Sequence, residues 1–78
     1  MTKFEEFKLN LQKAKVSGTL ILQKYDDRDV LIVALGYNYP DSKADKVWRV
    51  AEKMKLAYNE FEVCAEAYGP DIIKRSRF

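Results

Sequence analysis

Apolar residues near the start of the chain recur every three or four positions, a spacing typical of an amphipathic helix. This stripe consists of Phe4, Phe7, Leu11 and Ala14. Thr2 followed by Glu5 matches a capping box, in which the two side chains satisfy free amide groups of the first helical turn. The pattern therefore predicts an N-terminal amphipathic helix over residues 2–15.

The pattern then changes to short runs rich in β-branched and aromatic residues, which are typical of strands. These runs, 19–25 and 30–37, flank a polar turn and predict a β-hairpin over residues 19–37. The expected register pairs Tyr25 with Val30 and Leu22 with Val33. One face is then Leu20, Leu22, Leu31, Val33 and Leu35, and the other is Ile21, Gln23, Tyr25, Val30, Ile32 and Ala34. Because both faces are largely apolar, we expect something to cover part of the second face.

A third pattern runs through the second half of the chain, where apolar residues are spaced alternately by three and four positions. This seam consists of Val47, Val50, Met54, Ala57, Phe61, Cys64 and Tyr68. Such a heptad-like repeat predicts one long helix over residues 42–68, followed by a basic tail over residues 69–78. The expected fold is a single small α+β domain over residues 1–78, in the order α-β-β-α.

A rival interpretation concerns residues 61–65. Phe61, Val63 and Ala65 alternate with Glu62, Cys64 and Glu66, which is the period of a strand. This segment is therefore either the end of the long helix or a third strand, and we favour the helix because the heptad run is longer.

The seam also bears on assembly. A helix over 42–68 would be about 40 Å long, whereas a seven-residue strand spans only about 23 Å, so the hairpin cannot cover it. A lone two-stranded sheet is also marginally stable in water. The seven seam residues are therefore the expected interface of a homodimer, and the alternative is a monomer whose helix breaks near Asn59.

Composition excludes several kinds of chemistry. The chain is 47% hydrophobic and 33% charged, which is typical of a folded protein, and it has one cysteine and no histidine. Histidine-based catalysis and a structural zinc site are therefore not expected, and we predict a non-enzymatic protein without metal or cofactor. Asp26, Asp27 and Asp29 crowd one turn but lack the pattern of a calcium loop. The lone thiol of Cys64 and an N-terminal stretch that does not match a secretory signal favour a cytoplasmic location.

Basic residues form two groups. The first follows one flank of the predicted long helix, and the second belongs to the predicted tail: Lys43, Lys46, Arg49 and Lys53, and then Lys74, Arg75 and Arg77. Tyr37, Tyr39 and Trp48 are aromatic residues expected near them. Basic side chains beside stacking surfaces are the components of RNA-binding sites, although a solvated helix face has the same composition. Trp48 lies off the seam, so it either packs on the hairpin or is an exposed anchor for a partner.

In size and in its Lys-rich and Tyr-rich composition, the chain is similar to small host-modulating or counter-defence proteins of bacteriophages. This similarity implies a protein that blocks or modulates a host protein or protein complex. We therefore expect a small cytoplasmic homodimer that works by binding and has no membrane partner. The alternative is an RNA-binding or other nucleic-acid-binding protein that uses the basic flank and tail.

Overall fold

A computed structural model describes all of residues 1–78, and it contains two helices and four strands. In chain order these are α1 (Lys3–Lys13), β1 (Thr19–Tyr25), β2 (Arg28–Ala34), α2 (Asp41–Lys53), β3 (Phe61–Cys64) and β4 (Ile72–Arg77). The order is therefore helix, two strands, helix, two strands. The predicted order α-β-β-α with a long C-terminal helix is wrong.

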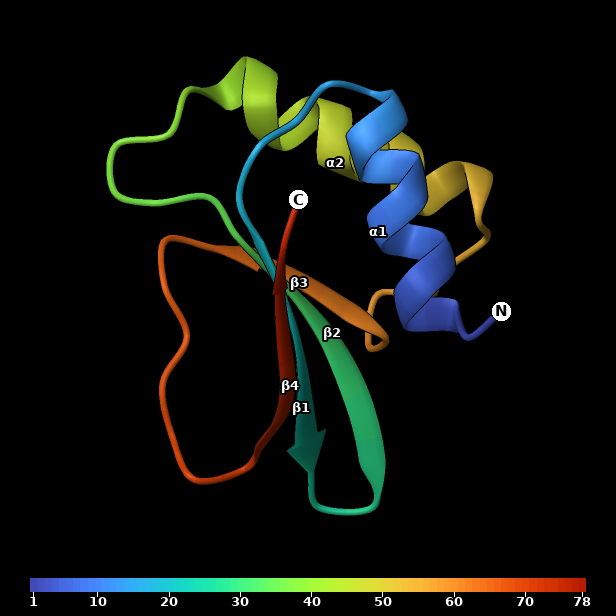
Figure 1. Ribbon diagram of the computed structural model, residues 1–78, viewed down its shortest axis with the longest axis vertical. Helices are drawn as coiled ribbons and strands as arrows, with labels where there is room; N and C mark the ends of the chain where they lie inside the picture. Colours follow the sequence, from blue (N-terminus) through green and yellow to red (C-terminus); the bar gives the residue numbers. More distant parts are fainter.

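The four strands form one mixed sheet in the order β3-β2-β1-β4. β1 is antiparallel to both β2 and β4, and β3 is parallel to β2. Both helices lie on the same side of the sheet, and the segment that connects β3 to β4 runs along the other side (Figure 1). This crossover is necessary because β3 and β4 lie at opposite edges of the sheet.

Local signals determine the first half of the fold. The Thr2 hydroxyl accepts a hydrogen bond from the Glu5 amide at 3.1 Å, so the predicted helix start is confirmed. The hairpin is also present, but its register is shifted by two residues, since Tyr25 pairs with Arg28 and Leu22 with Leu31. A two-residue shift leaves every side chain on its predicted face. Asp26 adopts a φ of 49°, which allows the tight two-residue turn.

The predicted helix over 42–68 ends after its first half, at Lys53. Lys55 has a φ of 58°, a left-handed conformation that stops an α-helix. The chain then turns and enters β3, so the rival interpretation of residues 61–65 as a strand is confirmed for Phe61–Cys64. Pairing with β2 places Phe61 against both helices, where it is buried, and these tertiary contacts outweigh the helix propensity of the segment.

The predicted basic tail over 69–78 is also wrong, because most of it forms strand β4. Thr19 pairs with Arg77 and Ile21 with Arg75, so the end of the described chain closes against β1. The register shifts between Leu22 and Gln23, which marks a bulge in β4. Charged side chains and a bulge are features that discourage an edge strand from pairing with other chains.

The core lies mainly between the helices and the sheet. Twelve buried residues make up this core: Phe4, Phe7, Leu11, Val16, Leu20, Leu31, Val33, Leu35, Val47, Val50, Ala51 and Phe61. A smaller cluster of Ile21, Val30 and Ile32 lies on the opposite face, where Ala67 of the crossover packs against it. The crossover is thus the cover that the apolar second face of the hairpin requires.

Candidate binding groove

An open groove of about 710 Å³ lies beside the crossover. Its walls come from the start of β1, the end of β4, the segment after β2 and the crossover itself. Three cations and one carboxylate line it, namely Lys43, Arg75, Arg77 and Glu66. Apolar side chains, among them Ile21, Leu35 and Phe78, supply much of the remaining lining. The groove therefore combines positive charge with apolar and aromatic surface.

Strand alternation in β4 determines which basic residues reach the groove. Arg75 and Arg77 lie opposite Ile21 and Thr19, on the sheet face away from the helices. Lys74 comes directly before Arg75 in the sequence and points to the other face, where its Nζ is 4.7 Å from the centre of the Phe4 ring. The three basic residues predicted as one patch are therefore divided between the two faces of the sheet.

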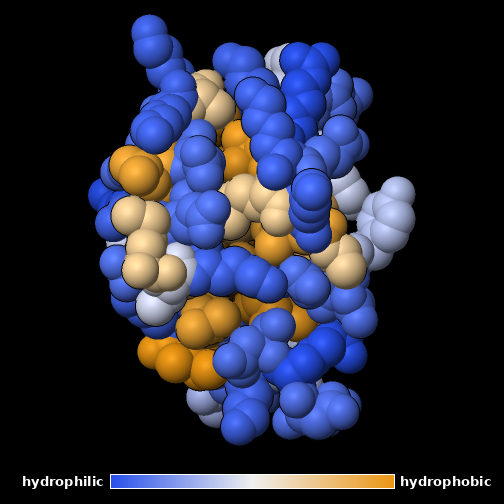
Figure 2. Space-filling model, turned by 90° about the vertical axis from the view of Figure 1, so that its right-hand side faces the viewer, coloured by the Kyte–Doolittle hydropathy of each residue, from blue (hydrophilic) through white to orange (hydrophobic).

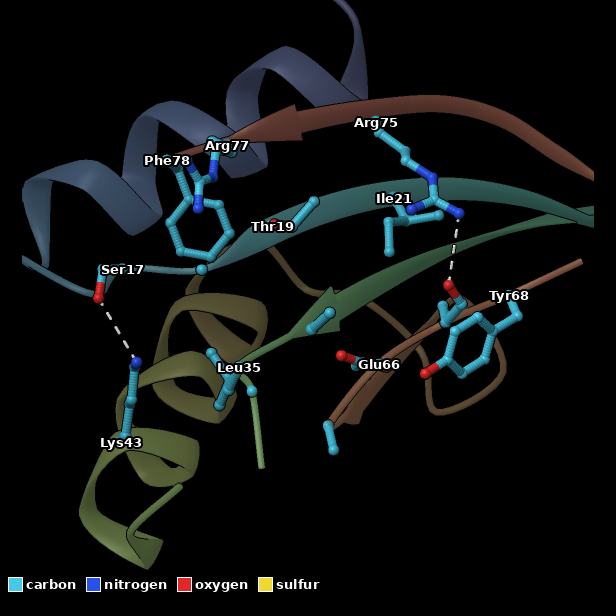
Figure 3. Close-up of a pocket in the computed structure, with 15 residues that line it drawn as sticks. Ser17, Thr19, Ile21, Leu35, Lys43, Glu66, Tyr68, Arg75, Arg77 and Phe78 are labelled. Atoms are coloured by element: carbon cyan, nitrogen blue, oxygen red, sulfur yellow. Dashed lines mark hydrogen bonds between the residues drawn. The ribbon is translucent and has the colours of Figure 1, made fainter. Parts of the chain in front are cut away.

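Lys43 joins the two arginines from the first turn of α2. Its ammonium group donates a hydrogen bond of 3.4 Å to the hydroxyl of Ser17, which places it at one side of the groove (Figure 3). The Arg75 guanidinium donates to the Ala67 carbonyl at 3.5 Å. The one ion pair of the structure joins Lys3 to Glu60, so none of the three cations of the groove belongs to an ion pair.

Hydrogen bonds hold the crossover wall in place. The Tyr37 hydroxyl donates to a Glu66 carboxylate oxygen at 3.2 Å, and it lies 3.4 Å from the hydroxyl of Tyr68. The Cys64 thiol donates to the Glu66 carbonyl at 3.3 Å. The pKa of Tyr37 is raised, chiefly by the negative charge of Glu66 and further by this hydrogen bond and slight burial. Glu66 and Tyr68 are thus positioned by the same phenol.

Gly18 forms another part of the wall, at a point where the backbones approach closely. A Cβ atom at this position would lie 2.7 Å from the Ala34 carbonyl oxygen. Gly18 also exchanges two backbone hydrogen bonds with Phe78, at 3.3 and 3.0 Å. Only glycine allows this approach without a shift of the backbone, and the approach places Phe78 at the edge of the groove.

The remaining residues predicted for nucleic-acid binding lie elsewhere. Lys46, Arg49 and Lys53 are exposed on α2 and do not line the groove. Tyr39 packs against the main core, whereas Tyr37 is exposed beside Glu66. The structure therefore brings together Lys43, Arg75 and Arg77 in the groove, places Tyr37 against Glu66, and leaves the rest of the predicted flank outside.

Trp48 combines the two roles that its position in the sequence left open. Its ring packs edge-on against Phe61, with ring centroids 4.7 Å apart, and 37% of the residue is exposed. Tyr58 lies against it at 5.8 Å and is 86% exposed. The two rings form a small aromatic surface at the β3 edge of the molecule.

The seven residues predicted for a dimer interface do not form a continuous seam, because the helix that would carry them ends at Lys53. Val47, Val50 and Phe61 are buried inside one chain. Met54 and Cys64 are half-buried, and only Ala57 and Tyr68 are exposed. On the side that Figure 2 shows, apolar side chains reach the surface in small areas separated by polar ones. Homodimerisation stays a prediction, but this seam no longer supports it.

Among the groove residues that sequence analysis missed are Ser17, Glu66 and Phe78. Each lies in a segment predicted as a turn, a helix or a tail, and each reaches the groove only through the pairing of β4 with β1 or through the crossover. The basic residues Lys43, Arg75 and Arg77 were the signals in the sequence that pointed to this region.

Two general properties complete the description. Neither helix is long and apolar enough to cross a membrane. No group of three or more cysteine or acidic side chains is arranged to hold a metal ion.

Comparison with known proteins yields no match. No family model fits the chain, and no curated protein or solved structure matches it significantly. Function must therefore be inferred from the groove itself.

Proposed function

We propose that the protein binds single-stranded RNA in the groove, with phosphate groups on Lys43, Arg75 and Arg77. The observation that supports this most strongly is the gathering of three cations, from segments far apart in the sequence, without a neutralising ion pair. Arginine and lysine are the side chains that contact phosphates in nucleic-acid complexes. Phe78 and Tyr68 supply aromatic rings in the same groove, and unpaired bases stack on such rings.

The shape of the groove favours a flexible single strand over a duplex. The groove is open along one side, and its apolar and aromatic lining would meet base faces that are accessible only when the bases are unpaired. The volume of about 710 Å³ lies within the range of sites that enclose small ligands, so we expect it to hold only a few nucleotides.

The test is fluorescence anisotropy with a labelled, unstructured RNA oligonucleotide at several salt concentrations. Lys43→Gln and Arg77→Gln should each weaken binding about tenfold, because each removes a charge-assisted contact. Each should also reduce the slope of log affinity against log salt by about 0.7, the contribution of one phosphate contact to a single strand.

The matched control is Lys53→Gln, on the same helix as Lys43. It lies ten residues further along α2, about 15 Å at the rise of an α-helix, and should leave affinity nearly unchanged. Equal losses for Lys43→Gln and Lys53→Gln would assign binding to the helix flank instead of the groove. Absence of binding at low salt would refute the proposal.

A protein partner is the second candidate, in keeping with a function that blocks or modulates a host protein. The Trp48–Tyr58 surface favours it, because exposed tyrosine and tryptophan side chains frequently anchor protein interfaces. Failure of RNA binding at low salt would make this surface the first to examine, with Tyr58→Ala as the variant.

A further inference from the structure

Glu66 is chemically out of place in a groove that binds phosphates. It is the only acidic side chain in the lining, and a negative charge there repels an RNA backbone. No cation pairs with it. Its one side-chain hydrogen bond comes from the Tyr37 hydroxyl to Oε2, which leaves Oε1 free to accept hydrogen bonds. A ligand that satisfies this carboxylate must bring N–H or O–H donors to it.

The hydroxyl end of Tyr68 lies near this carboxylate, because the Tyr37 hydroxyl contacts both side chains. Figure 3 places Glu66 and Tyr68 together at one side of the groove, opposite Lys43. Tyr68 is 69% exposed, so its ring remains available for stacking, and its hydroxyl lies 3.4 Å from that of Tyr37. Tyr37 thus contacts both residues and fixes the carboxylate relative to the ring. An acceptor next to an aromatic face can bind the edge and the face of one base.

Among the four RNA bases, guanine fits this carboxylate best. Its Watson–Crick edge carries adjacent N–H donors on N1 and N2, which two carboxylate lone pairs can accept together. Adenine and cytosine each offer a donor beside an acceptor, and uracil offers one donor between two acceptors. A hydrogen-bond acceptor on the base edge is repelled by a carboxylate oxygen. Guanine is therefore the only one of the four bases that can present two neighbouring donors to the carboxylate without such a repulsion.

We propose that Glu66, positioned by Tyr37 and flanked by the Tyr68 ring, selects a guanine base in the groove. This inference rests on the proposed RNA-binding function and adds the recognised base to it. Lys43 and Arg77 hold the backbone, and Glu66 reads the base that stacks on Tyr68.

The experiment compares uridine decamers that carry one central guanosine, inosine or adenosine, again by anisotropy. Guanosine should bind about tenfold more tightly than adenosine, as expected for a bidentate contact to a base edge. Inosine retains N1–H but lacks the N2 amino group, so its affinity should be intermediate. Equal affinity for the three decamers would overturn the inference while leaving RNA binding intact.

Glu66→Gln separates recognition from a structural role. The variant removes a negative charge, so its affinity for the all-uridine decamer should stay equal or rise, while the preference for guanosine falls at least fivefold. Glu62→Gln is the matched control, because Glu62 lies on neighbouring β3 and does not line the groove. An unchanged preference in Glu66→Gln would refute the assignment, as would its loss in both variants.

A final arm titrates free guanosine monophosphate against the labelled oligonucleotide. Weak displacement is expected, because a mononucleotide makes fewer phosphate contacts than a strand. The alternative result is that the mononucleotide binds more tightly than the oligonucleotide and that Glu66→Gln abolishes this binding. That result would retain guanine recognition but would show that the ligand is a free nucleotide and not RNA. Absence of RNA binding by the unaltered protein contradicts the proposed function, and an unselective groove contradicts only the role of Glu66.

Discussion

Tyr37 and Glu66 form a contact whose ionisation can be measured directly. The pKa of Tyr37 lies above the ordinary value of 10.0, first because of the Glu66 charge and then because of their hydrogen bond and slight burial. A raised folded-state pKa means that the neutral phenol stabilises the fold at lower pH. This contribution is complete below the unfolded-state pKa and is lost as pH rises through the folded-state pKa.

Glu66→Gln should therefore lower the pKa of Tyr37 towards 10.0. Nuclear magnetic resonance of the tyrosine ring signals during a pH titration measures this shift. Glu62→Gln is the control: it should leave Tyr37 unchanged and lower the pKa of Tyr25. That pKa is raised first by burial and then by the charge and hydrogen bond of Glu62. A Tyr37 titration that does not respond to Glu66→Gln would show that the two side chains are apart in solution.

Lys55 explains why α2 stops where it does. A left-handed conformation costs an L-residue roughly 1–2 kcal/mol, and glycine adopts it without that cost. Lys55→Gly should therefore raise the free energy of unfolding by about 0.5–1 kcal/mol, measured by urea denaturation. Lys53→Gly, still inside α2, should lower it by about 1 kcal/mol. Destabilisation by both variants would mean that the helix continues past Lys55.

At the scale of elements, β3 is the strand on which the second half of the fold depends. Phe61 is 5% exposed and packs edge-on against Phe7 of α1, with ring centroids 6.4 Å apart. It also contacts Trp48 of α2, so one side chain links the strand to both helices.

Phe61→Ala should therefore lower the free energy of unfolding by about 3–5 kcal/mol, the usual cost of removing a buried phenylalanine ring. Chemical denaturation measures the change. Tyr58→Ala, only three residues earlier but 86% exposed, should cost less than about 1 kcal/mol. Similar losses for the two variants would contradict the burial pattern of β3.

The elements that the sequence predicted correctly are those whose signals are local. Thr2 and Glu5 cap α1 within one turn, and β1 and β2 face each other across a two-residue turn. Phe61 shows why β3 was harder to predict, since it fits both the heptad spacing and the strand alternation. The deciding factor is the free edge of β2, which no pattern within residues 42–68 reveals.

The basic residues of β4 illustrate the same limit for the candidate site. Lys74, Arg75 and Arg77 resemble a solvated tail because an edge strand exposes most of its side chains. The sequence identified these residues as a basic group but did not show that alternation sends Lys74 to the opposite face. Glu66 and Phe78 carried no signal, because their positions depend on strands distant in sequence.

At the scale of the whole molecule, the sheet joins distant parts of the chain. Thr19 pairs with Arg77, whereas Phe61 pairs with Leu31 across an intervening helix. The helices cover one side and the crossover covers the other (Figure 1). The groove lies where these long-range connections meet, so its shape depends on the complete sheet and not on any one element.

This arrangement has a consequence for synthesis of the protein on the ribosome. The hairpin and both helices emerge first, but Arg75, Arg77 and Phe78 come from the end of the sequence described here. Until β4 docks on β1, the nascent chain has a free strand edge and lacks two of the three groove cations. At a translation rate of about 5–20 residues per second, β4 is synthesised several seconds after β1. The groove with its three cations therefore forms only after β4 has docked on β1.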